Sequence, residues 1–310
     1  MRLSVVIPVL NEYENLVTLY QELIPVLVTC VEEDFELIFI DDGSDDGTFA
    51  VLEFLHTQNP NVKVIQFRRN FGKSAALSAG FAAAQGDIVF TMDGDLQDDP
   101  AEIPRFLQPL ADGYDLISGW KYPRYDPLSK TVPSKLFNAT VRLTTGVPLH
   151  DFNCGFKAYR REVTQEIHLY GELHRYTPIL AHQKGFRVAE IKIAHRPRKF
   201  GRSKYGFRRF AKGFFDLLTV LFLGTYTWRP LHLFGWAGIA SFGLGFLVSL
   251  YLTVLWFGGH GPIGNRPLLT LGVLLLIIGI QFFTMGLLAE LITHGQAQAF
   301  SNYSVRRRLE

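Results

Sequence analysis

The residues best suited to chemistry are four aspartates within seven positions, in the segment TMDGDLQDDP at 91–100. This segment directly follows the apolar run IVF at 88–90. Carboxylates this close together repel one another unless a divalent cation or the hydrogen-bond donors of a ligand lie between them. Many acidic loops are solvated turns, so the segment predicts either such a turn or a site for a hard cation.

Acidic and amide side chains also end two earlier apolar runs. Asn11 and Glu12 follow the run LSVVIPVL, and Asp41 and Asp42 end the run FELIFI. The carboxyl ends of parallel strands meet at one edge of a sheet, where α/β proteins bind their ligands. We therefore expect these side chains and the acidic segment to surround one cleft.

Five apolar runs predict the strands that position these residues: 3–10, 35–44, 62–67, 87–93 and 115–120. Segments of about 10–15 residues with helical periodicity separate them. In the first such segment the leucines of one helical face are Leu16, Leu19, Leu23 and Leu27. The runs are continuously apolar, as expected for strands buried on both faces. The pattern predicts an α/β fold with a doubly wound, mostly parallel sheet.

Several common motifs do not fit. FGKS at 71–74 resembles the end of a phosphate-binding loop, but the glycine required five positions before Gly72 is Phe67. The acidic segment is not an EF-hand, because its sixth position is Asp98 instead of glycine, and no G-x-G-x-x-G follows the first strand. Two distant cysteines form no disulfide framework. The histidines lack metal-ligand spacing and are interpreted as packing or surface residues: His150, His174, His182 and His195.

The C-terminal third predicts two membrane spans. No Lys, Arg, Asp or Glu occurs from 231 to 265, and the stretches 233–257 and 268–289 each exceed the roughly 20 helical residues that cross a bilayer core. A pair of buried helices in a soluble domain is the alternative. Five glycines would let the two helices approach closely: Gly238, Gly243, Gly245, Gly279 and Gly286.

Basic residues flank the two spans on one side. Four precede the first span and three follow the second, whereas the connecting loop carries only Arg266. This asymmetry predicts an integral inner (plasma) membrane protein with both termini and the bulk of the chain in the cytoplasm. Between 206 and 230, basic residues mix with Phe and Leu at helical spacing. That pattern predicts an amphipathic helix on the membrane surface, with a buried helix as the alternative.

Six motifs in order carry a family resemblance: VVIPVLNE, IDDGSDDGT, RNFGKSAALSAG, MDGDLQDDP, DFNCGFKAYRR and GRSKYG. With them the chain resembles the family 2 glycosyltransferases of GT-A fold. More narrowly it resembles the polyprenyl-phosphate glycosyltransferases, which include dolichyl-phosphate mannose synthase and bacterial undecaprenyl-phosphate sugar transferases. The resemblance implies a cytoplasmic, Rossmann-like GT-A domain at 1–205, the juxtamembrane helix at 206–230, a transmembrane hairpin at 231–292 and a basic cytoplasmic tail at 293–310.

The resemblance also implies a nucleotide site and a metal site around the acidic segment. Asp95 and Gln97 would bind Mg²⁺ or Mn²⁺, with Asp95 also catalytic, and Asp42 would accept hydrogen bonds from the base or ribose. Asp98 and Asp99 replace the family's commoner His-Pro or Pro-Pro and are expected to be exposed turn residues. The other nucleotide-binding residues would be Pro8, Asn11, Glu12, Asp93 and Gly94.

The implied acceptor is a lipid phosphate, which needs cations near it. Lys121 and Lys130 would be catalytic and bind this phosphate, although some relatives have Arg there and Lys lacks the bidentate fork. Asp151 would be catalytic by orienting the nucleophile or a basic partner, with a simple turn or cap as the alternative. The remaining phosphate-binding residues would be Ser134, Arg198, Ser203 and Lys204.

The implied activity is the inverting, metal-dependent transfer of a single sugar from a nucleotide-sugar to undecaprenyl or dolichyl phosphate at the cytoplasmic membrane face. A UDP-hexose is the preferred donor, and GDP-mannose is the other candidate. Paired spans would allow a homo-oligomer, and no nucleic acid is expected as a partner. A processive polysaccharide synthase is disfavoured, since the chain has neither Q-x-x-R-W nor further spans. A non-catalytic, membrane-tethered nucleotide-sugar-binding protein stays open as an alternative.

Overall fold

The computed structural model describes residues 1–122, 138–171, 173–194, 196, 230–259 and 262–297 of the 310. The chain divides into two compact units, Met1–Val220 and Leu221–Glu310. The predicted amphipathic helix at 206–230 lies outside the described residues apart from Pro230. Most of the predicted tail at 293–310 lies outside them too.

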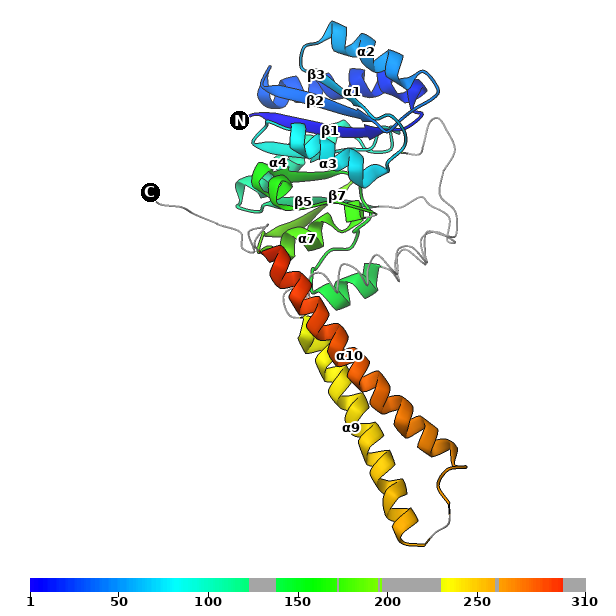
Figure 1. Ribbon diagram of the computed structural model, residues 1–310. Coiled ribbons are helices and arrows are strands. Elements are labelled where there is room, and N and C mark those ends of the chain that lie inside the picture. Colours follow the sequence, from blue (N-terminus) through cyan, green and yellow to red (C-terminus); the bar gives the residue numbers. More distant parts are fainter. Residues whose placement is uncertain (123–137, 172, 195, 197–229, 260–261, 298–310) are drawn as a thin grey trace. The chain divides into compact units, whose positions relative to one another are not determined.

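The first unit is built on a seven-stranded sheet (Figure 1). Its strands are β1 (Leu3–Val9), β2 (Phe35–Asp41), β3 (Val62–Gln66), β4 (Ile88–Thr91), β5 (Leu116–Lys121), β6 (Lys157–Arg160) and β7 (Val188–Ile193). They lie in the order β3-β2-β1-β4-β6-β5-β7. All neighbours are parallel except the two pairs that β6 makes, with β4 and with β5. The predicted mostly parallel sheet is confirmed, and β6 and β7 extend it beyond the five predicted runs.

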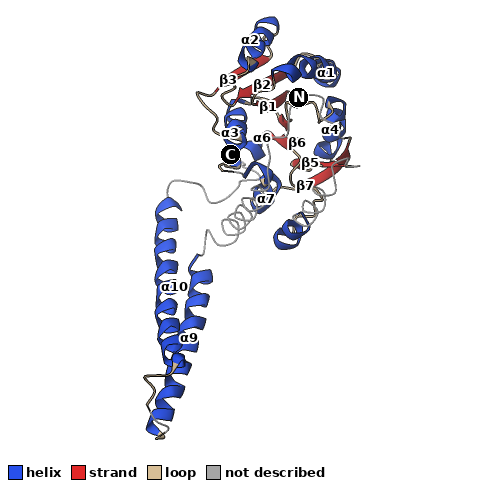
Figure 2. Cartoon of the chain, turned by 90° about the vertical axis from the view of Figure 1, so that its right-hand side faces the viewer, coloured by secondary structure: helices blue, strands red, loops and turns tan. Residues whose placement is uncertain are grey.

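Helices cover both faces of the sheet (Figure 2). α1 (Tyr13–Val31) and α4 (Ile103–Ala111) lie on one face, and α3 (Lys73–Ala83) and α6 (Arg161–Glu166) lie on the other. The remaining named helices of this unit are α2 (Thr48–Gln58), η1 (Pro100–Glu102), η2 (Leu173–Arg175) and α7 (Thr177–Gln183). Residues 138–145 are also helical. The four leucines predicted to share one face of α1 are all buried.

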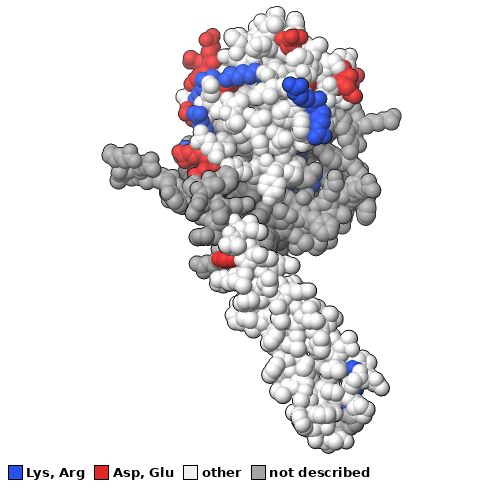
Figure 3. All heavy atoms as spheres, viewed as in Figure 1, with Lys and Arg blue, Asp and Glu red and all other residues white. Residues whose placement is uncertain are grey.

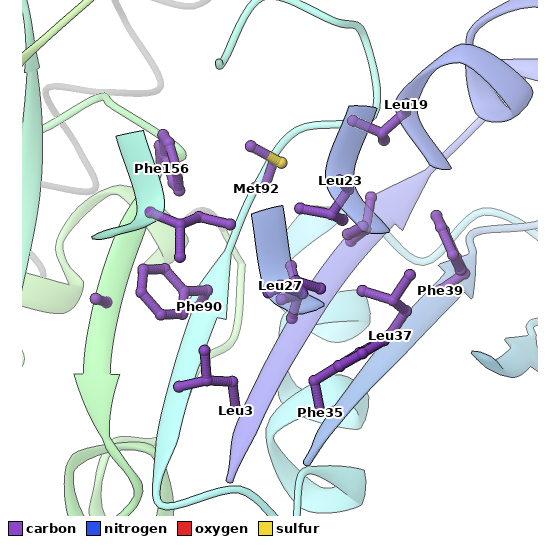
Figure 4. Close-up of a cluster of buried hydrophobic side chains, with 14 of the residues drawn as sticks. Leu3, Leu19, Leu23, Leu27, Phe35, Leu37, Phe39, Phe90, Met92 and Phe156 are labelled. Atoms are coloured by element: carbon purple, nitrogen blue, oxygen red, sulfur yellow. The ribbon is translucent and has the colours of Figure 1, made fainter. Parts of the chain in front are cut away.

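The main hydrophobic core fills the space between the sheet and the layer formed by α1 and α4 (Figure 4). Leu3 of β1 and Leu37 of β2 point into it, as do the leucines of α1. Near β4 the ring of Phe106 packs on those of Phe90 and Phe156, with centroids 5.9 and 4.7 Å away. Full burial of one such side chain contributes roughly 1.5–3 kcal/mol. This core fixes the strands whose ends carry the polar residues.

On the opposite face, α3 lies unusually close to the sheet because its residues are small. The helix reads KSAALSAGFAA. A Cβ added to Gly80 would lie 2.2 Å from Cγ1 of Val6 in β1. This close packing holds the first residues of α3, Lys73 and Ser74, at the polar edge of the sheet.

The second unit is a hairpin of α9 (Pro230–Phe257) and α10 (Pro267–Ala297). The helices contain segments of 27 and 26 residues, Leu231–Phe257 and Pro267–Ile292, that are long and apolar enough to cross a membrane. The described hairpin surface visible in Figure 3 is almost free of charged side chains. Length and composition therefore support the two predicted spans.

The hairpin packs through its glycines. A Cβ on Gly238 would lie 2.8 Å from the carbonyl oxygen of Gly279, and one on Gly245 would lie 2.7 Å from that of Gly272. Gly286 likewise faces Leu231 and Phe234, which makes the two helices antiparallel. The predicted close approach is confirmed at these residues. The prediction is wrong for Gly243, because a Cβ placed there would have no contact within 4 Å.

Candidate functional site

The polar residues that follow β1, β2 and β4 meet at one edge of the sheet, as expected. β1 lies between β2 and β4, parallel to both, and Val9 is in register with Asp41. Pro8 lies beyond the last β1–β4 pair, Val6 with Thr91. A proline has no N–H to donate, so its place past the end of this ladder breaks no hydrogen bond with β4.

Asn11 and Glu12 tie the end of β1 to the loop after β2. Asn11 has a positive φ of 53°. Its backbone N–H donates to Oγ of Ser44 at 2.9 Å, and its Nδ2 donates to Oδ1 of Asp45 at 2.7 Å. The backbone N–H of Glu12 donates to Oγ1 of Thr48 at 3.0 Å. These contacts fix the end of β1 against the loop after β2, and the predicted nucleotide contacts of both residues stay predictions.

Asp42 holds the loop that leads into α3. Its two carboxylate oxygens accept the backbone N–H groups of Phe71, at 2.7 Å, and Gly72, at 2.9 Å. The neighbouring Gly43 has a φ of +75°, and a Cβ there would lie 2.5 Å from the backbone of Arg69. The buried carboxylate therefore shapes the 69–72 loop, and its predicted contact with base or ribose stays a prediction.

Asp93 is held by a lysine from α3. Its carboxylate forms an ion pair with Lys73. Burial alone would raise the pKa of Asp93, but the ammonium groups of Lys73 and Lys121 outweigh burial and hold this pKa well below its ordinary value. A Cβ on Gly155 would lie 2.7 Å from both carboxylate oxygens, so a larger residue there would displace the Asp93 carboxylate. Position 94 favours glycine for another reason: a Cβ on Gly94 would lie 2.8 Å from Cγ1 of Val9.

Asp95 and Gln97 are the two residues predicted to bind a metal ion, and this role stays a prediction. Asp95 is buried, and its Oδ1 accepts the backbone N–H of Gln97 at 3.2 Å across a tight turn in which Leu96 has a φ of +62°. Within the described residues, no group of three His, Cys, Asp or Glu side chains could hold a metal ion. One carboxylate and one amide oxygen suit Mg²⁺ or Mn²⁺ when substrate phosphates supply further ligands. The donor set fits such an ion in a complex with a nucleotide diphosphate.

The expectation that Asp98 is an exposed turn residue is wrong. Its side chain is only 1% exposed and lies 3.1 Å from Nζ of Lys121, at the end of β5. Burial lowers the pKa of Lys121, but the attraction of the nearby anionic groups, Asp98 first and Asp93 as well, together outweighs burial and leaves the pKa raised. The chain buries these two charges because they neutralise each other. Lys121 thus lies beside the acidic segment, and its predicted contact with the acceptor phosphate stays a prediction.

The expectation of an exposed turn residue does not hold for Asp99 either. It caps η1 by accepting the backbone N–H of Ala101 at 3.0 Å, and its other oxygen lies 2.7 Å from Nη2 of Arg196. Arg196 in turn pairs with Glu22 of α1 at 2.5 Å, and its N–H donates to the carbonyl oxygen of Gln97. The acidic segment is therefore tied to α1 and to Arg196, three residues after the end of β7.

Asp151 is buried, at 1% exposure, and its Oδ1 accepts the backbone N–H of Asn153 at 3.1 Å. This contact fits the turn alternative, and the predicted catalytic role of Asp151 stays a prediction. The remaining predicted acceptor residues lie outside the described part of the chain: Lys130, Ser134, Arg198, Ser203 and Lys204.

Four residues near this edge were given no role in the predicted site: Lys73, Ser74, Lys157 and His174. Lys157 of β6 is 2% exposed and donates to the carbonyl oxygen of Cys154. Burial lowers its pKa to about 8, although Asp151 and Asp93 act in the opposite sense.

Ser74 accepts the backbone N–H of His174 at 3.1 Å and contacts its Nδ1 at 3.0 Å. Burial and Lys73 hold the pKa of His174 well below its ordinary value, so the imidazole is neutral at pH 7. The motifs FGKS and DFNCGFKAYRR contained Lys73 and Lys157, but spacing alone gave them no role.

Comparison with known proteins explains this arrangement. Residues 4–168 match Glycosyl transferase family 2, and residues 229–294 match the GtrB C-terminal hairpin. Dodecaprenyl-phosphate galacturonate synthase of Rhizobium johnstonii is 37% identical, over 99% of this chain and 93% of its own length. Undecaprenyl-phosphate 4-deoxy-4-formamido-L-arabinose transferase of Proteus mirabilis is also 37% identical, over 94% and 88%.

Solved structures share the fold of the first unit. Glucosyl-3-phosphoglycerate synthase from Mycobacterium tuberculosis, in complex with UDP, matches with a TM-score of 0.55 at 21% identity, over 72% of this chain and 79% of its own. A complex of the same enzyme with Mn²⁺, UDP and phosphoglyceric acid also gives a TM-score of 0.55. This likeness confirms the predicted GT-A fold. Together with the sequence matches, it shows that the chain is a glycosyltransferase of family 2, in the branch of polyprenyl-phosphate sugar transferases that end in a GtrB C-terminal hairpin.

Proposed function

We propose that this chain moves one sugar from a nucleotide-sugar to a polyprenyl phosphate, undecaprenyl or dolichyl, at the cytoplasmic face of the membrane. The observation that carries the proposal is the meeting of the acidic loop at 93–97 with the buried Lys121–Asp98 pair at one sheet edge. Both relatives are polyprenyl-phosphate sugar transferases by name, which supports the acceptor class. A UDP-hexose is the preferred donor, and GDP-mannose is the other candidate.

The donor side needs positive charge, because a nucleoside diphosphate leaves as an anion. Asp95 and Gln97 would hold Mg²⁺ or Mn²⁺, which neutralises the charge that develops on the leaving diphosphate. The Mn²⁺ complex of the distantly related synthase supports a cation in this fold. Lys73 adds a fixed positive charge beside Asp93. Asp42 would orient the base or ribose of the nucleotide, and Asn11 and Glu12 would border the nucleotide.

The acceptor side needs alignment more than deprotonation. A phosphate monoester with a second pKa near 6 is already largely ionised at neutral pH. Its oxygen would form a bond to the anomeric carbon from the face opposite the diphosphate, while the bond to the diphosphate breaks and the electron pair leaves with it. The configuration at that carbon inverts. Lys121 would bind the acceptor phosphate, joined by Lys130, Ser134, Arg198, Ser203 and Lys204. Asp151 would orient the nucleophile or one of its basic partners.

The second unit would anchor the enzyme in the inner membrane. The positive-inside asymmetry supports a topology with the catalytic domain, 1–205, and both termini in the cytoplasm. The juxtamembrane helix at 206–230, the hairpin at 231–292 and the tail at 293–310 would complete the chain. Four of the five predicted glycines pack inside the hairpin, so these residues give no support for a homo-oligomer.

Asp95→Asn tests the proposed site. The substitution keeps the size of the side chain but removes the carboxylate charge, so metal-dependent transfer should fall by at least about 100-fold. Expression and membrane insertion should be unchanged. Asp112→Asn, which alters an exposed residue after α4, is the matched control and should keep full activity. Transfer that survives Asp95→Asn would contradict the metal site, and nucleotide binding without any transfer in the unaltered protein would favour the non-catalytic alternative.

A further inference from the structure

His150, the residue immediately before Asp151, is bound through its backbone N–H, its ring and its carbonyl oxygen. Oε2 of Glu190, on β7, accepts the backbone N–H of His150 at 2.7 Å, and Oε1 of the same carboxylate pairs with its Nδ1. The carbonyl oxygen of His150 accepts Nδ2 of the buried Asn138 at 2.9 Å. Both backbone polar groups of His150 are therefore fixed, and with them the peptide bond that leads into Asp151.

An aromatic stack adds to these contacts. We call the side chains that hold His150, directly or through Trp120, the clamp: Glu190, Asn138, Trp120 and Lys192. The His150 ring lies parallel to that of Trp120, with centroids 4.2 Å apart and an interplanar angle of 10°. The ammonium of Lys192 lies 5.1 Å from the centroid of the same Trp120 ring. Trp120 and Lys192 are partners in the β5–β7 ladder, as are Ser118 and Glu190. Two paired strands of the sheet thus supply every side chain of the clamp except that of Asn138.

The same strand serves both the clamp and the site. Successive side chains of a strand point to opposite faces. Trp120 stacks on His150, and Lys121, one residue later, pairs with Asp98. Any shift of β5 would move both contacts together. The clamp therefore couples the position of Asp151 to that of Lys121.

We propose that Glu190 is a positioning residue for Asp151. Glu190 binds the backbone N–H and the ring of His150, and Trp120 stacks on the same ring. These contacts set where the Asp151 carboxylate lies relative to the acceptor. This inference rests on the proposed function. The ion pair within the clamp is partly in solvent, since the His150 side chain is 46% exposed and that of Glu190 is 13% exposed. Ion pairs of exposed groups contribute only about 0–1 kcal/mol to stability. Displacement of a reacting group by about 1 Å, in contrast, costs roughly 100-fold in rate.

The test compares Glu190→Ala, Glu190→Gln and the control Asp115→Ala in a transfer assay with undecaprenyl phosphate and the active nucleotide-sugar. Asp115 resembles Glu190: it accepts the backbone N–H of Arg187 at 2.7 Å and lies 3.6 Å from Nε of Arg160, but it precedes β5 at the strand's other end. Glu190→Ala should lower kcat about 10- to 100-fold, with the KM for the donor and the melting temperature close to those of the control. Glu190→Gln can keep both contacts to a neutral imidazole and should restore most of the activity.

A double-mutant cycle separates positioning from general damage. In an Asp151→Asn background, Glu190→Ala should have no further effect on kcat, because the group it positions is already gone. An effect of equal size in both backgrounds, or wild-type kcat in Glu190→Ala, would overturn the inference while leaving the proposed function in place. Absence of transfer in the unaltered protein with every donor would instead overturn the proposed function, and the inference with it.

Discussion

Buried charges distinguish the observed site from the predicted one at the scale of single residues. Asp98 sits in a polar run before a proline, a pattern typical of an exposed turn, yet it pairs with Lys121 in the interior. Sequence spacing does not show this pair, because β6, which follows β5 in the sequence, lies between β4 and β5 in the sheet. In contrast, the positions of Asp93 and Asp95 were predictable, since they directly follow an apolar strand.

Lys157 provides a stability test at this scale. Its pKa is about 8 in the folded protein, against an ordinary value of 10.5. The folded state therefore binds the proton less tightly than the unfolded state, and burial of the charged lysine is destabilising below pH 8. Lys157→Met should raise the free energy of unfolding by about 3 kcal/mol at pH 7. This advantage should shrink as the pH rises from about 8 towards 10.5, where the unfolded chain also loses its proton.

Urea denaturation of both proteins at pH 7 and pH 10, followed by circular dichroism, measures this difference. Lys184→Met removes a lysine at the surface, where its ion pair with Glu166 is 3.8 Å long, and should leave stability nearly unchanged at both pH values. A Lys157→Met protein that is less stable than the wild type at pH 7 would show that the ammonium stabilises the fold.

At the scale of elements, long periodic segments were predictable and short inserted ones were not. The leucine face of α1 and the apolar runs of β1 and β2 carry unambiguous patterns, because the leucines of α1 and nearly all residues of the two strands are buried. β6 has only four residues, KAYR, and begins and ends with a basic side chain. Its burial results from pairing with β4 and β5, which no local pattern reveals.

The hairpin glycines provide a test of element packing. A Cβ on Gly279 would lie 2.7 Å from backbone and Cβ atoms of Phe242, whereas Gly243 has open space around it. Gly279→Leu should force α9 and α10 apart and lower the melting temperature of the detergent-solubilised hairpin by several degrees. Gly243→Leu is the matched control and should melt as the wild type does. Thermal circular dichroism checks both, and equal melting temperatures would contradict the antiparallel packing described above.

At the scale of the whole molecule, a catalytic sheet domain and an apolar hairpin occur in one chain with a net charge of only +2. Motif order predicted this combination correctly, because six short motifs and two long apolar stretches each constrain a different part of the chain. The basic segment that joins the two units lies outside the described residues. The acceptor residues Arg198, Ser203 and Lys204 therefore still depend on the resemblance alone.

The central claim is tested most directly by the mass of the lipid product. Purified protein in detergent would be incubated with undecaprenyl phosphate, Mg²⁺ or Mn²⁺, and each member of a panel of UDP- and GDP-sugars, with a metal-free control. We predict that one donor adds a single sugar to the lipid and that omission of the metal abolishes the gain. An unchanged lipid mass with every donor, from protein that still binds nucleotide in the presence of metal, would contradict the account.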